Sequence, residues 1–288
     1  MNDTAMRTEL LKEILSVPTC TKHEDKLVAY LKDYCNKHGH DCEVDHTGNV
    51  LITKGVPAIG GYYPLVAAHT DSVHDIQHIN IIREDNRMFA VSDDGEYIGC
   101  GGDDKAGVFI CLELLETLPV LKVAFFWGEE TGCHGSWSVD DDFFSDVGYC
   151  LEFDSPESDI ISFSSNGYDL FDVYGDFANK AVPILDSYSI NKWQRHPYTD
   201  VSVLKRRFDF TCLNLPAGYY NMHSPDEYVN VLDVENSMLA GIAIVKALGH
   251  AKYKFVSNIY ETQTVPREVT GLRLRSFCSV DIEEDVLQ

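Results

Sequence analysis

Three apolar stretches of this chain end in side chains that can bind a cation. The stretch "YYPLVAAH" (62–69) ends on a histidine, "LKVAFFWGEE" (121–130) on two glutamates, and "GYCLEFD" (148–154) on an aspartate. Almost wholly apolar runs of this kind are typical of strands in the centre of a parallel sheet. Ligands of such sheets collect at the carboxyl ends of the strands, so we expect a binding site there.

Helical segments alternate with these strands. The sequence predicts helices over 7–17, 23–39, 103–118, 199–207 and 233–250. The other expected strands are a hairpin over 42–55 that turns at Gly48, a hairpin over 79–92, and an extended segment over 208–215. We therefore predict an α/β fold, a three-layer sandwich whose mostly parallel central sheet is flanked by helices.

The chain contains no internal repeat, low-complexity tract or linker. Its 288 residues, 44% of them hydrophobic, can bury a core as one large domain or two small ones. We expect residues 1–252 to form a single domain. Residues 253–288 have weak periodicity and are expected to add a strand or a loose tail to it.

The charge and the cysteines limit the partners and the compartment. With 46 acidic and 23 basic side chains the formal charge is −23, which argues against nucleic acid and membrane as partners, although it also serves solubility. Nine cysteines without a CxxC pair suggest free thiols. The N-terminus lacks the apolar core of a signal peptide, and no apolar run approaches membrane-spanning length, so we expect a cytoplasmic protein.

Histidines and carboxylates recur at the ends of apolar segments or in a glycine-rich loop. A single such residue is more often structural than a ligand, but a set of them is harder to explain in that way. Carboxylates that converge repel one another unless cations are bound, and imidazole with carboxylate favours zinc or a similar divalent ion. The set, separated by 34, 26, 24 and 69 residues, is His69, Asp103, Glu129 with Glu130, Asp154 and His223.

Between about residues 8 and 250, the chain resembles the di-zinc exopeptidases, the metallopeptidases that include zinc aminopeptidases, tripeptidase T and carboxypeptidase G. Each matching motif is modest alone, but all occur in the family's order. The motifs are "DHTGNVLITKG", the H-x-D of "HTDSV", the Asp-Asp-Lys of "GGDDKAG", the Glu-Glu of "GEETGCHGS", the Asp of "LEFDSP", "YTD" (198–200) and "NMHSPDEYV".

The resemblance implies a role for each residue of the set. Asp103 would bridge two metal ions, with His69 and Asp154 completing one site and Glu130 and His223 the other. Glu129 would be the general base, and Asp71 would orient His69 by accepting its second N–H, although a turn role for Asp71 stays open. The resemblance also implies a cis peptide bond between Asp103 and Asp104.

Other polar residues near the motifs are weaker candidates for ligands. His74, His78 and His134 match no ligand position and are expected in loops or behind the ligands. Cys100 and Cys133 could be soft ligands, but no cysteine spacing supports this.

The resemblance also implies what is absent. Larger relatives insert a lid or dimerisation domain between the ligands matching Asp154 and His223, or another domain between those matching His69 and Asp103. Gaps of 69 and 34 residues leave little room for either domain. The chain therefore resembles the bare metallopeptidase catalytic domain.

The expected activity is metal-dependent hydrolysis of the terminal peptide bond of short peptides. Two divalent ions are expected, most simply Zn²⁺, with Co²⁺ or Mn²⁺ as alternatives. A carboxypeptidase or an N-acyl amino acid deacylase of the same fold, acting on acyl-amino-acid substrates, and an inactive binding protein remain open.

An aminopeptidase is favoured over a carboxypeptidase because the lid that often supplies a carboxylate-binding arginine is missing. Spare acids near the motifs could hold an ammonium group, namely Asp93, Asp94, Glu96 and Glu152. Three arginines could instead reach a substrate carboxylate if their segments fold inward, namely Arg195, Arg206 and Arg207.

Overall fold

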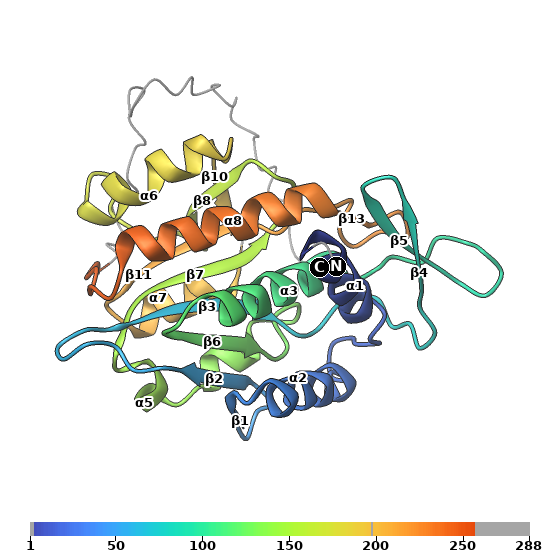
Figure 1. The fold of residues 1–288 in the computed structure, drawn as a ribbon, viewed down its shortest axis with the longest axis horizontal. Helices are drawn as coiled ribbons and strands as arrows, with labels where there is room; N and C mark the ends of the chain where they lie inside the picture. The colour runs from blue at the N-terminus through green and yellow to red at the C-terminus, as the bar shows by residue number, and fades with distance from the viewer. Residues whose placement is uncertain (1–2, 197, 257–288) are drawn as a thin grey trace, which may run out of the picture.

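A nine-stranded mixed sheet runs through the protein in the computed structural model, which describes residues 3–196 and 198–256 (Figure 1). Its centre is made of four parallel strands in the order β6, β3, β7, β11. Every residue of these strands is buried, as expected for strands covered on both faces. The strands are β6 (Leu121–Phe126), β3 (Tyr63–His69), β7 (Val147–Ser155) and β11 (Thr211–Pro216).

Further strands extend this centre on both sides, in antiparallel pairs except for the parallel pair of β8 and β10. The expected hairpin around Gly48 is present, formed by β1 (Asp41–Val44) and β2 (Val50–Lys54), and β2 pairs with β6. On the other side β11 pairs with β8 (Ile160–Ser165), which pairs in turn with β9 (Tyr168–Asp169) and β10 (Lys192–His196).

Helices cover both faces of the sheet. In Figure 1, α3 (Gly102–Thr117) and α8 (Val231–Leu248) lie in front of it, and α7 (Asp200–Arg207) lies behind it. The predicted three-layer α/β fold is thus confirmed. The remaining helices are α1 (Asp3–Leu15), α2 (Asp25–His38), α4 (His134–Ser138), α5 (Asp141–Phe144) and α6 (Asp176–Ser187).

A second, smaller sheet stands beside the first. It has the antiparallel order β12 (Tyr219–Tyr220), β13 (Tyr228–Asn230), β5 (Arg87–Val91), β4 (Asn80–Glu84). The expected hairpin over 79–92 is therefore present, and it lies within the interval between His69 and Asp103. Within the described ranges, the intervals between the expected ligands hold parts of these two sheets and their helices and no separate lid domain.

The C-terminal expectation can be compared with the structure only in part. Residues 253–256 run beside the start of β11, where the Thr211 N–H donates to the Tyr253 carbonyl at 2.8 Å. The rest of the expected strand or tail, 257–288, lies outside the described residues. Eight cysteines are free thiols, and the ninth, Cys278, lies outside the described part of the chain. Among the described helices, none has the length and apolarity needed to cross a membrane.

Candidate metal centre

The central strands bring the expected ligands to one edge of the sheet. His69 is the last residue of β3, Asp154 lies at the end of β7, and the Glu129–Glu130 pair follows β6. Because these three strands are parallel, their carboxyl ends meet at the same edge. Asp103 reaches this edge from the first turn of α3.

One group of ligand atoms is buried and centred on His69. Its Nε2 lies 3.1 Å from Asp103 Oδ1 and 3.5 Å from Asp154 Oδ1. All three side chains are buried. The group thus offers one imidazole nitrogen and two carboxylate oxygens, a donor set suited to zinc.

A second group lies at the rim and is centred on His223. Its Nε2 lies 3.3 Å from Asp103 Oδ2 and 3.1 Å from Glu130 Oε1. The His223 side chain is 43% exposed and comes from the loop between β12 and β13. The two oxygens of Asp103 therefore face different histidines, which is the arrangement that a carboxylate bridging two cations needs.

The charge balance of the centre fits divalent cations. Burial raises the pKa of Glu130 to about 7 and raises that of Glu129 well above its usual range, and neighbouring carboxylates, including Asp103 and Asp154, add to both shifts. A cation placed among these oxygens would remove the cost of holding them charged and close together. The residues present therefore fit bound divalent cations.

The carboxylates of the centre raise the pKa values of both histidines. Burial alone would lower the pKa of His69, but contacts with Asp103, Asp154 and Asp71 raise it well above its usual range. The contact with Asp103 raises the pKa of His223 to about 9. The neighbouring carboxylates thus favour the protonated form of both imidazoles, and a bound ion would compete with these protons.

Asp71 holds both the histidine and the glutamate loop. Its Oδ1 lies 3.3 Å from Nδ1 of His69, the ring nitrogen turned away from the centre. The same carboxylate accepts the backbone N–H groups of Glu129 at 2.9 Å and Glu130 at 3.3 Å, and the Thr21 hydroxyl at 2.9 Å. Contacts with two ligand-bearing segments favour an orienting role over that of a simple turn residue.

Glu129 lies beside the ligand groups and belongs to neither. By distance, two sets of described side chains can share one cation, His69 with Asp103 and Glu130, and His69 with Asp104 and Asp154, and neither set contains Glu129. His223 joins the ligands through its own contacts with Asp103 and Glu130. The Glu129 side chain contacts Cys133, whose Sγ lies 3.5 Å from Glu129 Oε1. Its carboxylate is therefore not committed to the ligand set.

Asp104 is an addition that sequence reasoning did not assign. Its Oδ2 accepts the backbone N–H of His69 at 3.2 Å, and its Oδ1 accepts that of Gly107 at 3.0 Å. Asp104 thus joins the end of β3 to the first turn of α3. The peptide bond between Asp103 and Asp104 is cis, as the resemblance implied.

A buried polar network supports Asp154 from behind. The Thr199 hydroxyl lies 2.8 Å from Asp154 Oδ2 and also contacts the Glu152 carboxyl group, and Asp200 accepts from the Ser136 hydroxyl at 2.5 Å. Burial raises the pKa of Asp200 to about 7 and that of Glu152 well above its usual range. The "YTD" motif signalled Thr199 and Asp200, but sequence reasoning gave neither a role.

Glu152, one of the spare acids, is buried in this network and is not open to a substrate ammonium group.

The three arginines that could have bound a substrate carboxylate make contacts with other parts of the protein. Arg207, at the end of α7, donates to the carbonyl oxygens of Ser136, Trp137 and Val139 and to Asp141. Arg206 lies over the rings of Trp137 and Tyr168, and Arg195 over that of Phe163. Because Thr199 at the other end of α7 touches Asp154, the two α7 arginines lie roughly 9 Å or more along the helix from the centre.

The weaker candidates for ligands lie outside both groups. His134 packs against the ring of Trp127, and His78 is exposed. His74 Nε2 lies 3.1 Å from Glu227 Oε2, behind the centre. Within the described residues, neither candidate metal group includes Cys100 or Cys133.

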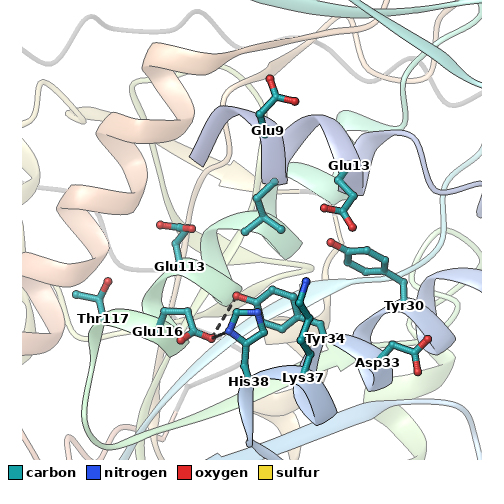
Figure 2. A pocket seen from close by; sticks show the side chains of 11 residues that line it. Glu9, Glu13, Tyr30, Asp33, Tyr34, Lys37, His38, Glu113, Glu116 and Thr117 are labelled. Carbon is teal, nitrogen blue, oxygen red and sulfur yellow. Dashed lines mark hydrogen bonds and ion pairs between the residues drawn. The ribbon is translucent and has the colours of Figure 1, made fainter. Parts of the chain in front are cut away.

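The acidic cavity between α1, α2 and α3 is unrelated to this centre. It has a volume of about 840 Å³ and is lined by carboxylates that include Glu9, Glu13 and Glu113. Figure 2 shows these acids spread along separate helices, while Tyr34 and His38 both contact Glu116, at 3.2 and 3.4 Å. Neither of the two candidate metal groups in the described residues lies here.

Comparisons with known proteins agree with this fold. No protein-family model and no curated protein sequence matches the chain. Solved structures do match. An aminopeptidase from Bacillus cereus has 14% identity and a TM-score of 0.68 over 85% of this chain and 99% of its own. A tripeptidase from Staphylococcus aureus has 14% identity and a TM-score of 0.69 over 85% and 98%.

A third solved structure, described as an endoglucanase from Thermotoga maritima, has 14% identity and a TM-score of 0.60 over 83% of this chain and 99% of its own. Identities this low show a shared fold and leave the reaction to be argued from the site. The resemblance seen in the sequence is thus confirmed at the level of the fold: the chain has the architecture of these solved structures, without a lid domain in its described residues.

Proposed function

We propose that the protein is a metal-dependent exopeptidase that removes terminal residues from short peptides. The observation that carries the proposal is the position of Asp103, whose two carboxylate oxygens face His69 on one side and His223 on the other. A carboxylate placed in this way can hold two cations close together, and two-metal sites are a common solution for hydrolysing amide bonds.

Each half of the centre would hold one ion. His69 and Asp154 would bind the first, Glu130 and His223 the second, and Asp103 would bind both. Such ions, when bound, supply a Lewis acid for the scissile carbonyl and lower the pKa of a bound water. Nitrogen and oxygen donors favour Zn²⁺ and also accept Co²⁺ or Mn²⁺.

Glu129 is proposed to move the proton. Its side chain is half-buried, burial raises its pKa, and it lies outside the ligand groups. A carboxylate with a raised pKa is suited to take a proton from the attacking water and return it to the leaving amine. Asp71 holds the His69 ring and the Glu129 backbone in position during this proton transfer.

An aminopeptidase is favoured over a carboxypeptidase. Arg207 is occupied by three carbonyl oxygens and a carboxylate, and Arg206 lies against two aromatic rings away from the centre. These contacts support a site without an arginine for a substrate carboxylate. The exposed acids Asp93, Asp94 and Glu96 remain candidates for attracting a substrate ammonium group, whereas Glu152 does not.

The test is hydrolysis of Leu-Gly-Gly by the metal-loaded protein, compared with its N-acetylated and its C-terminally amidated forms. We expect the free and the amidated peptides to be cleaved and the acetylated peptide to resist. Faster cleavage of the acetylated peptide would instead favour a deacylase. Loss of activity on the amidated peptide alone would favour a carboxypeptidase. Bound metal without hydrolysis in such a panel would favour the inactive binding protein.

We further propose that the protein works in the cytoplasm on short peptides or acyl-amino acids, without nucleic acid or membrane as a partner. The formal charge of −23 supports the exclusion of polyanions. Eight unpaired cysteines support a reducing compartment.

A further inference from the structure

Glu227 is a buried carboxylate that contacts the centre only through other residues. Its side chain is 0% exposed and lies four residues beyond His223, at the end of the loop that carries this histidine. Its oxygens point at the start of α3. Neither candidate metal group in the described residues contains it.

Both oxygens of Glu227 accept backbone N–H groups from the segment that carries Asp103. Oε2 accepts from Gly101 at 2.6 Å, and Oε1 accepts from Asp103 itself at 3.1 Å. Gly101 precedes α3 and has no side chain that could cap the helix. The first N–H groups of a helix need acceptors, and here a carboxylate from a distant loop supplies them.

The same carboxylate reaches the segment that follows His69. His74 Nε2 lies 3.1 Å from Glu227 Oε2, and the His74 ring lies against Gly99, where a Cβ would come within 2.4 Å of it. The Gly99 N–H donates to the carbonyl of Pro225, two residues before Glu227, at 2.8 Å. Segments bearing three expected ligands, His69, Asp103 and His223, therefore meet at one side chain.

We infer that Glu227 is a positioning residue that sets the distance between Asp103 and His223, and so determines the affinity of the second metal position. This inference rests on the proposed function. His69 and Asp154 are fixed by the ends of buried strands, whereas His223 lies on an exposed loop that this carboxylate ties to α3. The loss of Glu227 should therefore affect the rim position far more than the buried one.

The direct variant is Glu227→Gln, which keeps the shape but offers one acceptor oxygen where two N–H groups need one each. Metal-free protein is titrated with Co²⁺, and the visible absorption and a competing chelator report each binding step separately. We expect the second ion to bind ~10- to 100-fold more weakly, the range seen when a residue behind a ligand is changed, and the first ion to change much less. The matched control is Asp226→Asn, which removes the same charge from an exposed neighbour in the same loop and should leave both steps as in the wild type.

Glu227→Asp serves if the glutamine variant does not fold. It keeps the charge but withdraws the oxygens by one methylene, so partial recovery of the second step is expected. Wild-type affinity at both steps in either folded variant, or equal weakening of both, would overturn the inference while leaving the two-metal proposal standing. A wild-type protein that binds a single ion would overturn both.

Discussion

His69 and His223 approach the same aspartate from opposite sides, but their surroundings differ. His69 ends a fully buried strand, is 2% exposed, and has Asp71 behind its ring. His223 is 43% exposed, has a positive φ of 62°, and depends on a loop that Glu227 ties to α3. The buried half is thus set by the sheet, whereas the rim half is set by a few side-chain contacts.

This difference predicts unequal metal affinities. Buried ligands fixed by strands need little reordering when an ion binds, while the ligands of an exposed loop lose conformational freedom. We therefore expect the His69 position to fill first and the His223 position to exchange its ion more readily.

Replacing Asp103 should abolish metal binding at both positions. Asp103→Ala deletes the one residue that faces both histidines, so both ions should be lost and turnover should fall to background. The melting temperature of the metal-treated protein should fall as well, because bound metal no longer stabilises the native state. Elemental analysis and thermal unfolding with and without added metal are the measurements, and a variant that keeps both ions would refute the bridging role.

Replacing Glu129 should strongly reduce turnover without changing metal binding at either position. Glu129→Gln removes the proposed proton acceptor but leaves the ligand groups, so metal content and folding should stay nearly as in the wild type. Turnover should drop by roughly 10²-fold or more, as expected for the loss of a general base. Steady-state kinetics beside metal analysis of the same sample decide the matter, and metal loss equal to that of Asp103→Ala would contradict the division of roles.

The two histidine variants separate the halves. His223→Ala should release the second ion and retain the first, since the contacts among His69, Asp103 and Asp154 remain. His69→Ala should weaken both positions, because the remaining carboxylates at the buried edge lose their imidazole. Co²⁺ titration of the two metal-free variants provides the comparison, and identical profiles would mean that the halves are not distinct.

Asp71 should have the smallest effect of this series. Asp71→Asn keeps an acceptor for one backbone N–H but weakens the hold on the His69 ring and on the Glu129–Glu130 turn. A loss of ~10- to 100-fold in metal affinity or activity is expected. Chelator competition measures it, with Thr21→Val as the control that removes only the hydroxyl contact to Asp71. An Asn variant with unchanged affinity would leave Asp71 as a turn residue.

The sequence predicts the centre of the fold better than its edges. Strands β3, β6 and β7 are apolar runs and were predicted from that pattern, and so were the polar residues at their ends. The stretch 156–198 was left without predicted elements, although it holds α6 and three strands. Strand β8 reads "IISFSS", and its Ser162 hydroxyl pairs with that of Ser155 at 2.9 Å, a contact between strands that the sequence pattern does not show. Helix α6 contains Pro183, which interrupts a helical pattern.

The candidate site, like the fold, has a part that the sequence predicts and a part that it does not. His69, Glu130 and Asp154 follow strands, and Asp103 begins a helix, that sequence pattern could place, whereas His223 lies in a loop between two strands that it did not predict. The supporting residues could not be found in this way. Asp104, Thr199 and Glu227 act through residues 35, 45 and 124 positions away, and such contacts exist only once the strands are ordered in the sheet.

The central claim is a pair of unequal metal positions joined by Asp103. The most direct measurement is a titration of the metal-free wild-type protein with Zn²⁺ by calorimetry, with elemental analysis of the product and activity followed at each step. The account predicts two ions per chain that bind in separate steps, with full activity only after the second. One tightly bound ion per chain with full activity would contradict it.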